Sequence, residues 1–129
     1  MLSLYTPTGA RSAVGSVPAA TIGQTLHASV VLDVLRAGGN AVDAAVGISL
    51  ALGVVEPHMS GLGGDGFYNV HSAETGMNVC FNATGAAPAS ATAESFARGM
   101  AVTGARSVSV PGKLAGLAMM HDRLGSIPW

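Results

Sequence analysis

Two adjacent glycines, Gly38 and Gly39, divide the first half of the chain into two helices. Apolar residues recur before them at intervals of three and four, which predicts an amphipathic helix over about 24–37. Gly38 can take the left-handed conformation that ends a helix. Asn40 can cap the next helix, and Asp43 stands three residues later in a capping-box position. We expect two helices joined this closely to pack side by side on one apolar layer.

The composition limits the class of protein. The chain has 129 residues, of which 49% are hydrophobic and only 10% charged. The length fits one domain with a real core. Charged residues normally make up about a quarter of a soluble domain, so we expect more protein to cover part of this surface. The net charge is −1 with basic residues dispersed, which argues against a nucleic acid or an anionic membrane as partner.

No metal or cofactor site is predicted. The single cysteine, Cys80, excludes an internal disulfide and a cysteine-based metal site, and we expect it to be a small buried strand residue. The four histidines do not cluster, and we interpret His27 and His121 as satisfied core or rim residues. A Ser-His-Asp triad has no nucleophile-elbow motif to support it. Neither a signal segment nor a membrane-spanning run is evident, so we expect a cytoplasmic protein.

The pattern along the chain predicts an α+β architecture. Residues 1–22 read as an irregular lead-in, where a short strand near 13–17 is compatible with the sequence. The helix over 41–52 is apolar nearly all round and should be buried on most faces. Beyond it, the strands 67–71 and 77–81 flank a hairpin turn. Met77, Val79 and Phe81 alternate there with Asn78, Cys80 and Asn82, which predicts one buried and one polar face.

The last third of the chain carries weaker signals. A short helix is expected near 93–98 with Thr92 as its cap, followed by an extended segment over 107–112. A final helix should end at Gly125. Its expected apolar stripe comprises Leu114, Leu117, His121 and Leu124.

The glycine-rich loop Gly61-Leu62-Gly63-Gly64-Asp65-Gly66 has the spacing of a dinucleotide-binding fingerprint. That mechanism needs a strand before the loop and a helix after it, whereas here a helix precedes and a strand follows. We therefore interpret the loop as structural, with glycines that permit positive φ and close packing. Asp65 is expected to hold it by an Asx-type hydrogen bond. The structural loop residues are Gly61, Gly63, Gly64, Asp65 and Gly66.

Several segments, in order and correctly spaced, resemble the γ-glutamyltranspeptidase (glutathione hydrolase) family. They are residues 38–45, 52–58, 60–67, 86–88 with Thr92, 108–117 and 121–129. The resemblance covers nearly the whole chain, from about Val14 to Trp129. It implies that residues 1–129 are the N-terminal segment of the family's large subunit. It also implies an N-terminal-nucleophile hydrolase fold of αββα layers, present only in part.

The resemblance further implies a mechanism. A family member is made as one precursor that cuts itself into large and small subunits. The new N-terminal threonine of the small subunit is the nucleophile, and its own amine is the general base. No threonine of this chain stands in a Thr-Thr-His or Thr-Ser-His segment, so we expect no catalytic residue here. The implied partners are the rest of the large subunit and the small subunit, without a cofactor or metal.

The expected substrate loop departs from the family pattern. The resemblance places an arginine that binds the substrate carboxylate at Thr84 or Ala86. Neither is arginine, and residues 82–88 hold no cation. Thr84, Gly85 and Ala86 are therefore candidate substrate-binding residues without the family's arginine, which favours a small amide other than glutathione.

Two functions stay open at this point. One is a portion of an amidohydrolase or acyltransferase that cleaves γ-glutamyl or other small amides through a threonine outside this chain. The other is a non-catalytic scaffold or partner subunit that keeps the large-subunit fold. An adjoining segment with the processing threonine would favour the enzyme.

Overall fold

In a computed structural model, residues 11–12, 21–22 and 25–129 are described, with side chains from residue 28 onward. The expected strand near 13–17 lies outside these residues. The chain divides into two compact units. The first comprises residues 1–61 and 121–129, and the second comprises residues 62–120. Among the described residues, no helix is long and apolar enough to span a membrane.

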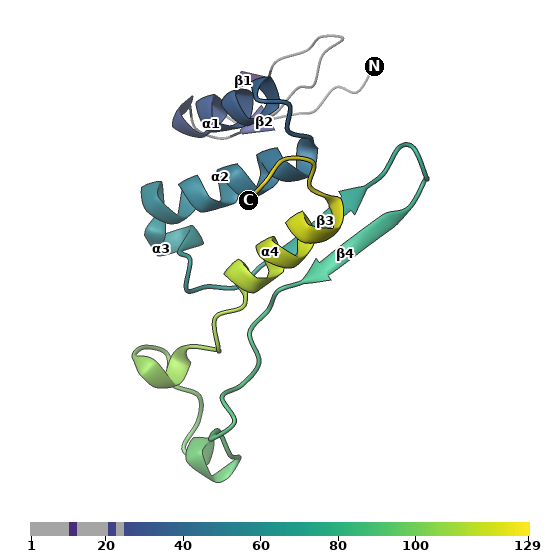
Figure 1. Cartoon of the computed structure of the whole chain (residues 1–129). Coiled ribbons are helices and arrows are strands. Elements are labelled where there is room, and N and C mark those ends of the chain that lie inside the picture. The colour runs from purple at the N-terminus through teal and green to yellow at the C-terminus, as the bar shows by residue number, and fades with distance from the viewer. Residues whose placement is uncertain (1–10, 13–20, 23–24) are drawn as a thin grey trace. The chain divides into compact units, whose positions relative to one another are not determined.

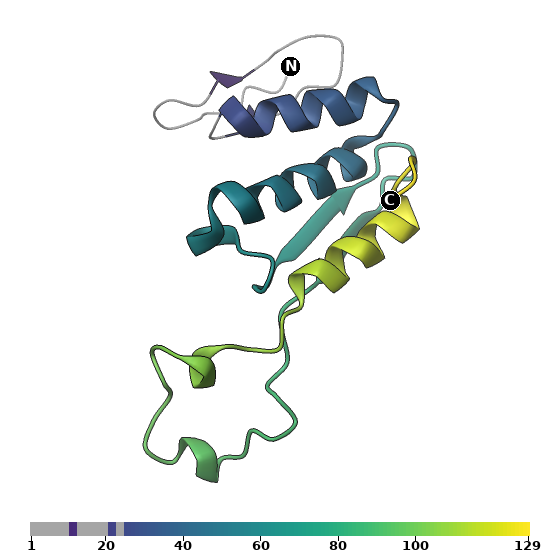
Figure 2. The ribbon, with the colours of Figure 1, turned by 60° about the vertical axis from the view of Figure 1, so that its left-hand side comes forward.

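The first unit is built on two helices, α1 (Thr25–Arg36) and α2 (Ala41–Val55). They lie side by side in both views (Figures 1 and 2), as the short connection predicts. Their approach is close at Gly47, where an added Cβ would stand 3.2 Å from Val34 Cγ2 and 3.3 Å from Val30 Cγ1. A short antiparallel pair, β1 (Arg11–Ser12) with β2 (Thr21–Ile22), and a single turn, α3 (Pro57–Ser60), complete the described elements of this unit.

The predicted capping box at the start of α2 is confirmed. Gly38 has a φ of 91°, and Asn40 is the N-cap. The Asn40 side chain accepts hydrogen bonds from Val42 N at 2.8 Å and Asp43 N at 3.1 Å, and Asp43 Oδ2 accepts one from Asn40 N at 2.7 Å. Three backbone donors that the helix leaves unpaired are thereby satisfied by side chains.

The Asp43 carboxylate also binds the last residues of the chain. It is only 4% exposed. Ser126 donates to it through both its backbone N, at 3.1 Å, and its Oγ, at 2.7 Å, and His121 Nε2 lies 3.2 Å from its Oδ1. Asn40 Nδ2 adds a bond to the carbonyl oxygen of Leu124 at 2.7 Å. One buried carboxylate thus joins the first turn of α2 to residues 121–126.

The packing of α2 differs in part from the prediction. The helix runs to Val55 rather than ending near Leu52, and Pro57 then starts α3. Proline is tolerated in the first turn of a helix, where its missing N–H is not needed. Val42, Ala44 and Val46 are buried, but Val54 is 77% exposed. The expectation of burial on most faces therefore fails in the last turn.

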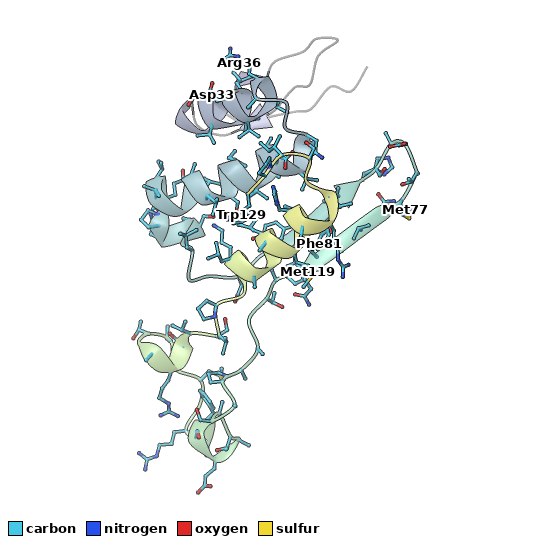
Figure 3. All side chains as sticks on the ribbon, in the orientation of Figure 1. Asp33, Arg36, Met77, Phe81, Met119 and Trp129 are labelled. Atoms are coloured by element: carbon cyan, nitrogen blue, oxygen red, sulfur yellow. The ribbon has the colours of Figure 1, made fainter. Side chains whose placement is uncertain are left out.

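The second unit contains the hairpin of β3 (Phe67–His71) and β4 (Asn78–Asn82), which pairs Tyr68 with Phe81. The second strand begins one residue later than predicted. Phe81 is buried, whereas Met77, beside the turn, is 58% exposed (Figure 3). Cys80 is a strand residue and shares the polar face with Asn78 and Asn82 as the alternation predicts, but its expected burial is wrong, because this face of β4 is exposed. Its place in the alternation, rather than its apolar character, decides its burial.

The segment after the hairpin is more irregular than predicted. The expected helix over 93–98 is a 3₁₀ turn, η1 (Glu94–Phe96), although Thr92 Oγ1 does accept from Ser95 N as a cap would. A second 3₁₀ turn, η2 (Ala105–Ser107), overlaps the start of the expected extended segment. The hydrogen bonds of a 3₁₀ turn have poorer geometry than those of an α-helix, so a single 3₁₀ turn rarely nucleates a longer helix.

Helix α4 (Lys113–Leu124) ends before Gly125 as predicted, but its buried side differs from the expected stripe. Leu117 and Met120 are almost fully buried, together with Lys113 and Gly116, whereas Leu114 is 46% exposed. Gly116 explains the difference, since its lack of a side chain admits a neighbour. An added Cβ would collide with Ala83 Cβ and stand 3.2 Å from Tyr68 Cε2.

We predict that Gly116→Ala lowers the free energy of unfolding of the protein. Alanine favours the helix by about 1 kcal/mol, but the crowding at Ala83 should cost about 1–3 kcal/mol and outweigh it. Urea unfolding followed by circular dichroism measures the difference. Gly63→Ala is the matched control, because no atom lies within 4 Å of a Cβ there. Equal or greater stability of Gly116→Ala would contradict this packing.

The free energy of unfolding should also depend on pH through Asp43. Burial raises the pKa of Asp43, but the hydrogen bonds from Ser126, Asn40 and Ile127 outweigh it and hold the pKa below the ordinary value of 3.8. The unfolded chain therefore binds more protons than the folded one as the pH approaches 4. Stability from this group is complete above that pH and is lost as the pH falls through the folded pKa.

Asp43→Asn should accordingly lower the free energy of unfolding at pH 7 by about 2–4 kcal/mol and flatten its fall between about pH 5 and 3. Urea titrations at several pH values test this, with Asp122→Asn, at an exposed position of α4, as control. If both variants kept the wild-type pH dependence, the assignment to Asp43 would be wrong.

Candidate functional site

The glycine-rich loop has the element order that argues against a dinucleotide site. Helix α3 precedes it and β3 follows it, so no helix begins where a pyrophosphate would bind. Among the described glycines, positive φ occurs at 38, 76, 99 and 104, and not in this loop. Close packing accounts for glycine at two positions of the loop, Gly61 and Gly66, whereas nothing crowds a Cβ at Gly63. A Cβ at Gly66 would stand 2.8 Å from Tyr68 Oη, and one at Gly61 would stand 2.8 Å from the Pro57 oxygen.

Asp65 joins the loop to two distant segments. Its Oδ1 accepts a hydrogen bond from Gly85 N and its Oδ2 accepts one from Ser109 Oγ, each at 2.7 Å. The expected local Asx-type bond is therefore wrong, because the acceptors serve donors 20 and 44 residues away. A charged acceptor with two such donors makes strong, short bonds. The carboxylate positions the backbone of the candidate substrate loop.

Backbone hydrogen bonds extend this arrangement into what we call the loop junction, residues 64–66, 83–86 and 109–113. Gly66 and Ala83 exchange bonds of 2.9 and 3.3 Å between their N and O atoms. The Gly64 oxygen accepts from the N atoms of Gly112 and Lys113, at 3.3 and 3.0 Å. The start of α4 is thereby fixed to the glycine-rich loop. Val110 N donates to the Ala86 oxygen at 3.0 Å.

Gly85 is the most crowded position of the junction. A Cβ there would overlap the Val110 oxygen and stand 2.6 Å from Ser109 Oγ. Its neighbours behave differently, because Thr84 and Ala86 are both exposed. Asn82 Oδ1 accepts from Thr84 N at 3.0 Å and from Thr84 Oγ1 at 2.5 Å. The junction therefore fixes the backbone of this loop and leaves two side chains facing outward, neither of them charged.

Among the described side chains, the histidines form neither a catalytic triad nor a metal site. Ser126 Oγ donates to Asp43 and not to His121, so these three residues do not form a hydrolytic triad, in which histidine must take the serine proton. His71 Nδ1 lies 2.9 Å from Asn78 Oδ1 on the hairpin. No group of three or more metal-ligating residues occurs among the described residues.

Lys113 is the one buried cation among the side chains described from residue 28 onward. It is 3% exposed, and burial lowers its pKa. Its backbone N belongs to the loop junction, and its carbonyl oxygen accepts a bond from Tyr68 Oη at 3.4 Å. The residue therefore fixes the first turn of α4 against the hairpin.

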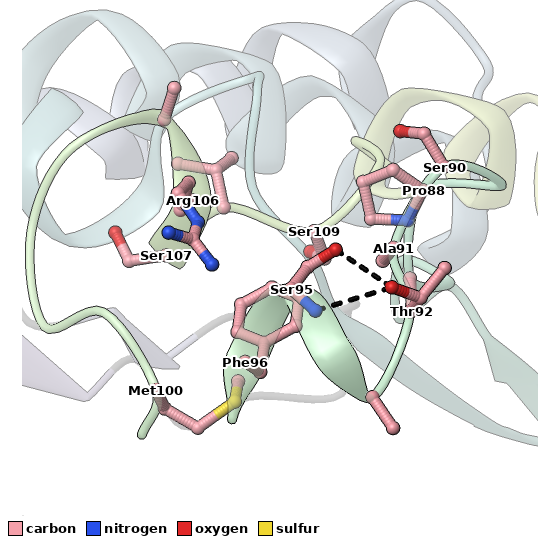
Figure 4. Close-up of a pocket in the computed structure, with 14 residues that line it drawn as sticks. Pro88, Ser90, Ala91, Thr92, Ser95, Phe96, Met100, Arg106, Ser107 and Ser109 are labelled. Carbon is pink, nitrogen blue, oxygen red and sulfur yellow. Dashed lines mark hydrogen bonds between the residues drawn. The ribbon is translucent and has the colours of Figure 1, made fainter. Parts of the chain in front are cut away.

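Sequence reasoning missed a cavity in the same unit. It has a volume of about 740 Å³ and lies between residues 87–96 and 100–109 (Figure 4). Ser109, which binds Asp65, belongs to its wall, as do Phe96 and Arg106. Ser109 lies in the segment 108–117 that carries the family resemblance, but no motif or period marks Phe96 or Arg106, which long loops bring to the cavity.

Comparisons with known proteins agree on one family. The model of the family described as Gamma-glutamyltranspeptidase matches residues 28–129. The glutathione hydrolase proenzyme of Bacillus subtilis (strain 168) is 42% identical over 109 residues, which are 78% of this chain and 19% of that protein. Scoloptoxin SSD14 of Scolopendra dehaani is 38% identical over 122 residues, or 92% of this chain and 20% of that protein. The chain thus spans about a fifth of the length of these curated relatives.

A solved structure is also similar. The gamma-glutamyltranspeptidase of Pseudomonas nitroreducens, complexed with L-DON, has a TM-score of 0.75 and 31% sequence identity to this chain. The match covers 89% of this chain and 35% of that one.

The Asp65 bonds can be tested by hydrogen exchange. Asp65→Ala removes the acceptor of Gly85 N, and we expect the amide of Gly85 to exchange about tenfold faster or more, the effect of losing one charge-assisted bond. Mass spectrometry of peptides that cover residues 82–88 measures this. Asp33→Ala is the control, because Asp33 pairs with Arg36 on the exposed surface of α1 (Figure 3). Unchanged exchange at Gly85 would show that Asp65 does not hold the loop.

Proposed function

This chain belongs to the gamma-glutamyltranspeptidase family, and we propose that it is the N-terminal part of the large subunit of an amidohydrolase or acyltransferase. Its α+β fold is a partial N-terminal-nucleophile hydrolase fold. The proposed substrates are γ-glutamyl or other small amides. The nucleophilic threonine is placed outside residues 1–129, since none of the threonines in the chain has the expected context.

In this proposal, the threonine hydroxyl adds to the amide carbonyl while the α-amine of the same residue takes its proton. The proton then passes to the leaving amine as the carbon–nitrogen bond breaks. Water or an acceptor amine resolves the acyl ester. Hydrogen-bond donors outside this chain stabilise the oxyanion.

The observation that carries the proposal is the loop junction. Asp65 binds the backbone N–H of Gly85, Val110 N binds the Ala86 oxygen, and the side chains at 84 and 86 are exposed. We infer that this loop is one wall of the substrate pocket. Its lack of a cation supports a small amide other than glutathione, since a guanidinium fork would otherwise bind the substrate carboxylate.

The proposed partners are the rest of the large subunit and the small subunit. Exposed apolar side chains in each unit support a covering partner. Val54 and Met59 are 77% and 78% exposed in the first unit, and Val102 is 93% exposed in the second. Side chains of this kind are normally removed from water when a larger fold or an interface covers them.

We test the function with the complete natural protein that contains this chain. It is incubated with γ-glutamyl-p-nitroanilide and with a panel of p-nitroanilides of other small acids. We expect at least one panel member to be turned over with a kcat/KM about tenfold or more above that of the γ-glutamyl compound. The reason is that the carboxylate of the γ-glutamyl compound would lack a charged partner in residues 82–88, and a charge-assisted bond is worth about this factor. Thr84→Arg and Ala86→Arg should raise γ-glutamyl turnover. Ala73→Arg, at an exposed position of the hairpin turn, is the charge-matched control.

Ordinary γ-glutamyl turnover by the wild type, lost on mutation of this loop, would contradict the proposed substrate preference. The alternative function, a non-catalytic scaffold, rests on the missing arginine. It would be supported if no amide were turned over and mass spectrometry found neither a processed chain pair nor an acyl adduct.

A further inference from the structure

The cavity beside the loop junction is a candidate binding site that differs in composition from the substrate loop. Its walls come from the irregular stretch between β4 and α4, including η1 and η2. It begins at Ala87 and Pro88, directly after the substrate loop, and ends at Ser109, which binds Asp65. Its volume of about 740 Å³ is in the range of small-molecule sites.

Charge in this cavity has one sign. Arg106 is a lining residue, and none of the described lining residues is an aspartate or a glutamate. Among the residues with described side chains, no carboxylate forms an ion pair with Arg106. The Arg106 guanidinium lies 5.1 Å from the centre of the Phe96 ring, and Figure 4 shows the two side chains facing one another. Stacking on an aromatic ring holds the guanidinium plane in place, which leaves its N–H groups available to an anion.

The rest of the wall sets the shape of the ligand. Phe96, Met100 and Val108 provide apolar contact surface, and Ser90 and Ser95 provide hydroxyl groups. Thr92 and Ser95 bind each other at 2.9 Å, on a part of the wall away from Arg106 (Figure 4). A ligand that matches these groups has a carboxylate at one end and an apolar, preferably aromatic, body.

We propose that this cavity binds the carboxylate of a small aryl or branched-alkyl acid, with Arg106 as the residue that positions it. The inference rests on the proposed function in one respect, namely that such an acid is part of the amide substrate. Arg106 then supplies, from a separate loop, the cation that residues 82–88 lack. Binding itself is independent of turnover.

The test uses 3-phenylpropanoate and its neutral isostere 3-phenylpropanamide as probes, with the complete natural protein that contains this chain. Isothermal titration calorimetry should show binding of the acid, with Kd at least about tenfold higher in Arg106→Met. The amide probe should bind more weakly than the acid and be insensitive to this change. Arg98→Met is the control, since Arg98 is exposed and does not line the cavity. Arg106→Lys should recover part of the affinity.

Kinetics separate this inference from the proposed function. With a p-nitroanilide that carries a free carboxylate, Arg106→Met should raise KM about tenfold and leave the methyl ester of that substrate unaffected. Acid binding that depends on Arg106 without turnover of any amide would support the site and overturn the function. Turnover with the same acid affinity and KM in wild type and Arg106→Met would overturn the site and leave the function standing. Failure of the acid to bind the wild type would also overturn the site.

Discussion

A buried carboxylate can remain charged only when hydrogen-bond donors surround it, and each unit of this structure is organised around one aspartate. In the first unit, Asp43 is 4% exposed and accepts bonds from Asn40 and Ser126. Leaving such a group without its donors costs more than the bonds contribute. The start of α2 and the residues after α4 must therefore form together, because neither can satisfy the charge alone. In the second unit, the Asp65 carboxylate is exposed, so water can also solvate its charge, and its bonds to Gly85 and Ser109 serve to connect distant segments of the chain.

The two aspartates also mark how far the sequence predicts this structure. The bond from Asp43 to Asn40 spans three residues and belongs to a known capping pattern, so the pattern predicts it. The bonds of Asp43 to Ser126 and of Asp65 to Ser109 span 83 and 44 residues, and no local rule contains them. The helices, the hairpin and the element order around the glycine-rich loop could be predicted because each depends on periodicity or turn residues.

The failures have physical causes of the same kind. The residue type of Cys80 predicts burial, whereas the side of the strand decides its exposure. Helical spacing predicts that Leu114 is buried, whereas the close contact of Gly116 with Ala83 sets the buried side of α4. The candidate loop at Thr84, Gly85 and Ala86 was located by resemblance, and the structure adds its support from Asp65. The cavity with Arg106 could not be predicted, because it is formed by long irregular segments whose paths depend on the whole unit.

The support of this loop has a consequence for evolution and redesign. Asp65 binds the backbone N–H of Gly85 and no side chain of the loop. This hydrogen bond therefore does not depend on which side chains stand at positions 84 and 86. Related proteins can therefore exchange the residues at these two positions while the supporting frame is retained, and under the proposed function such exchanges change which substrates they accept. Position 85 has no such freedom, since the Val110 oxygen occupies the space of any side chain. A mutagenesis library that diversifies 84 and 86 and keeps 85 as glycine should therefore retain most of its members as folded protein, and it would sample new selectivity under the proposed function.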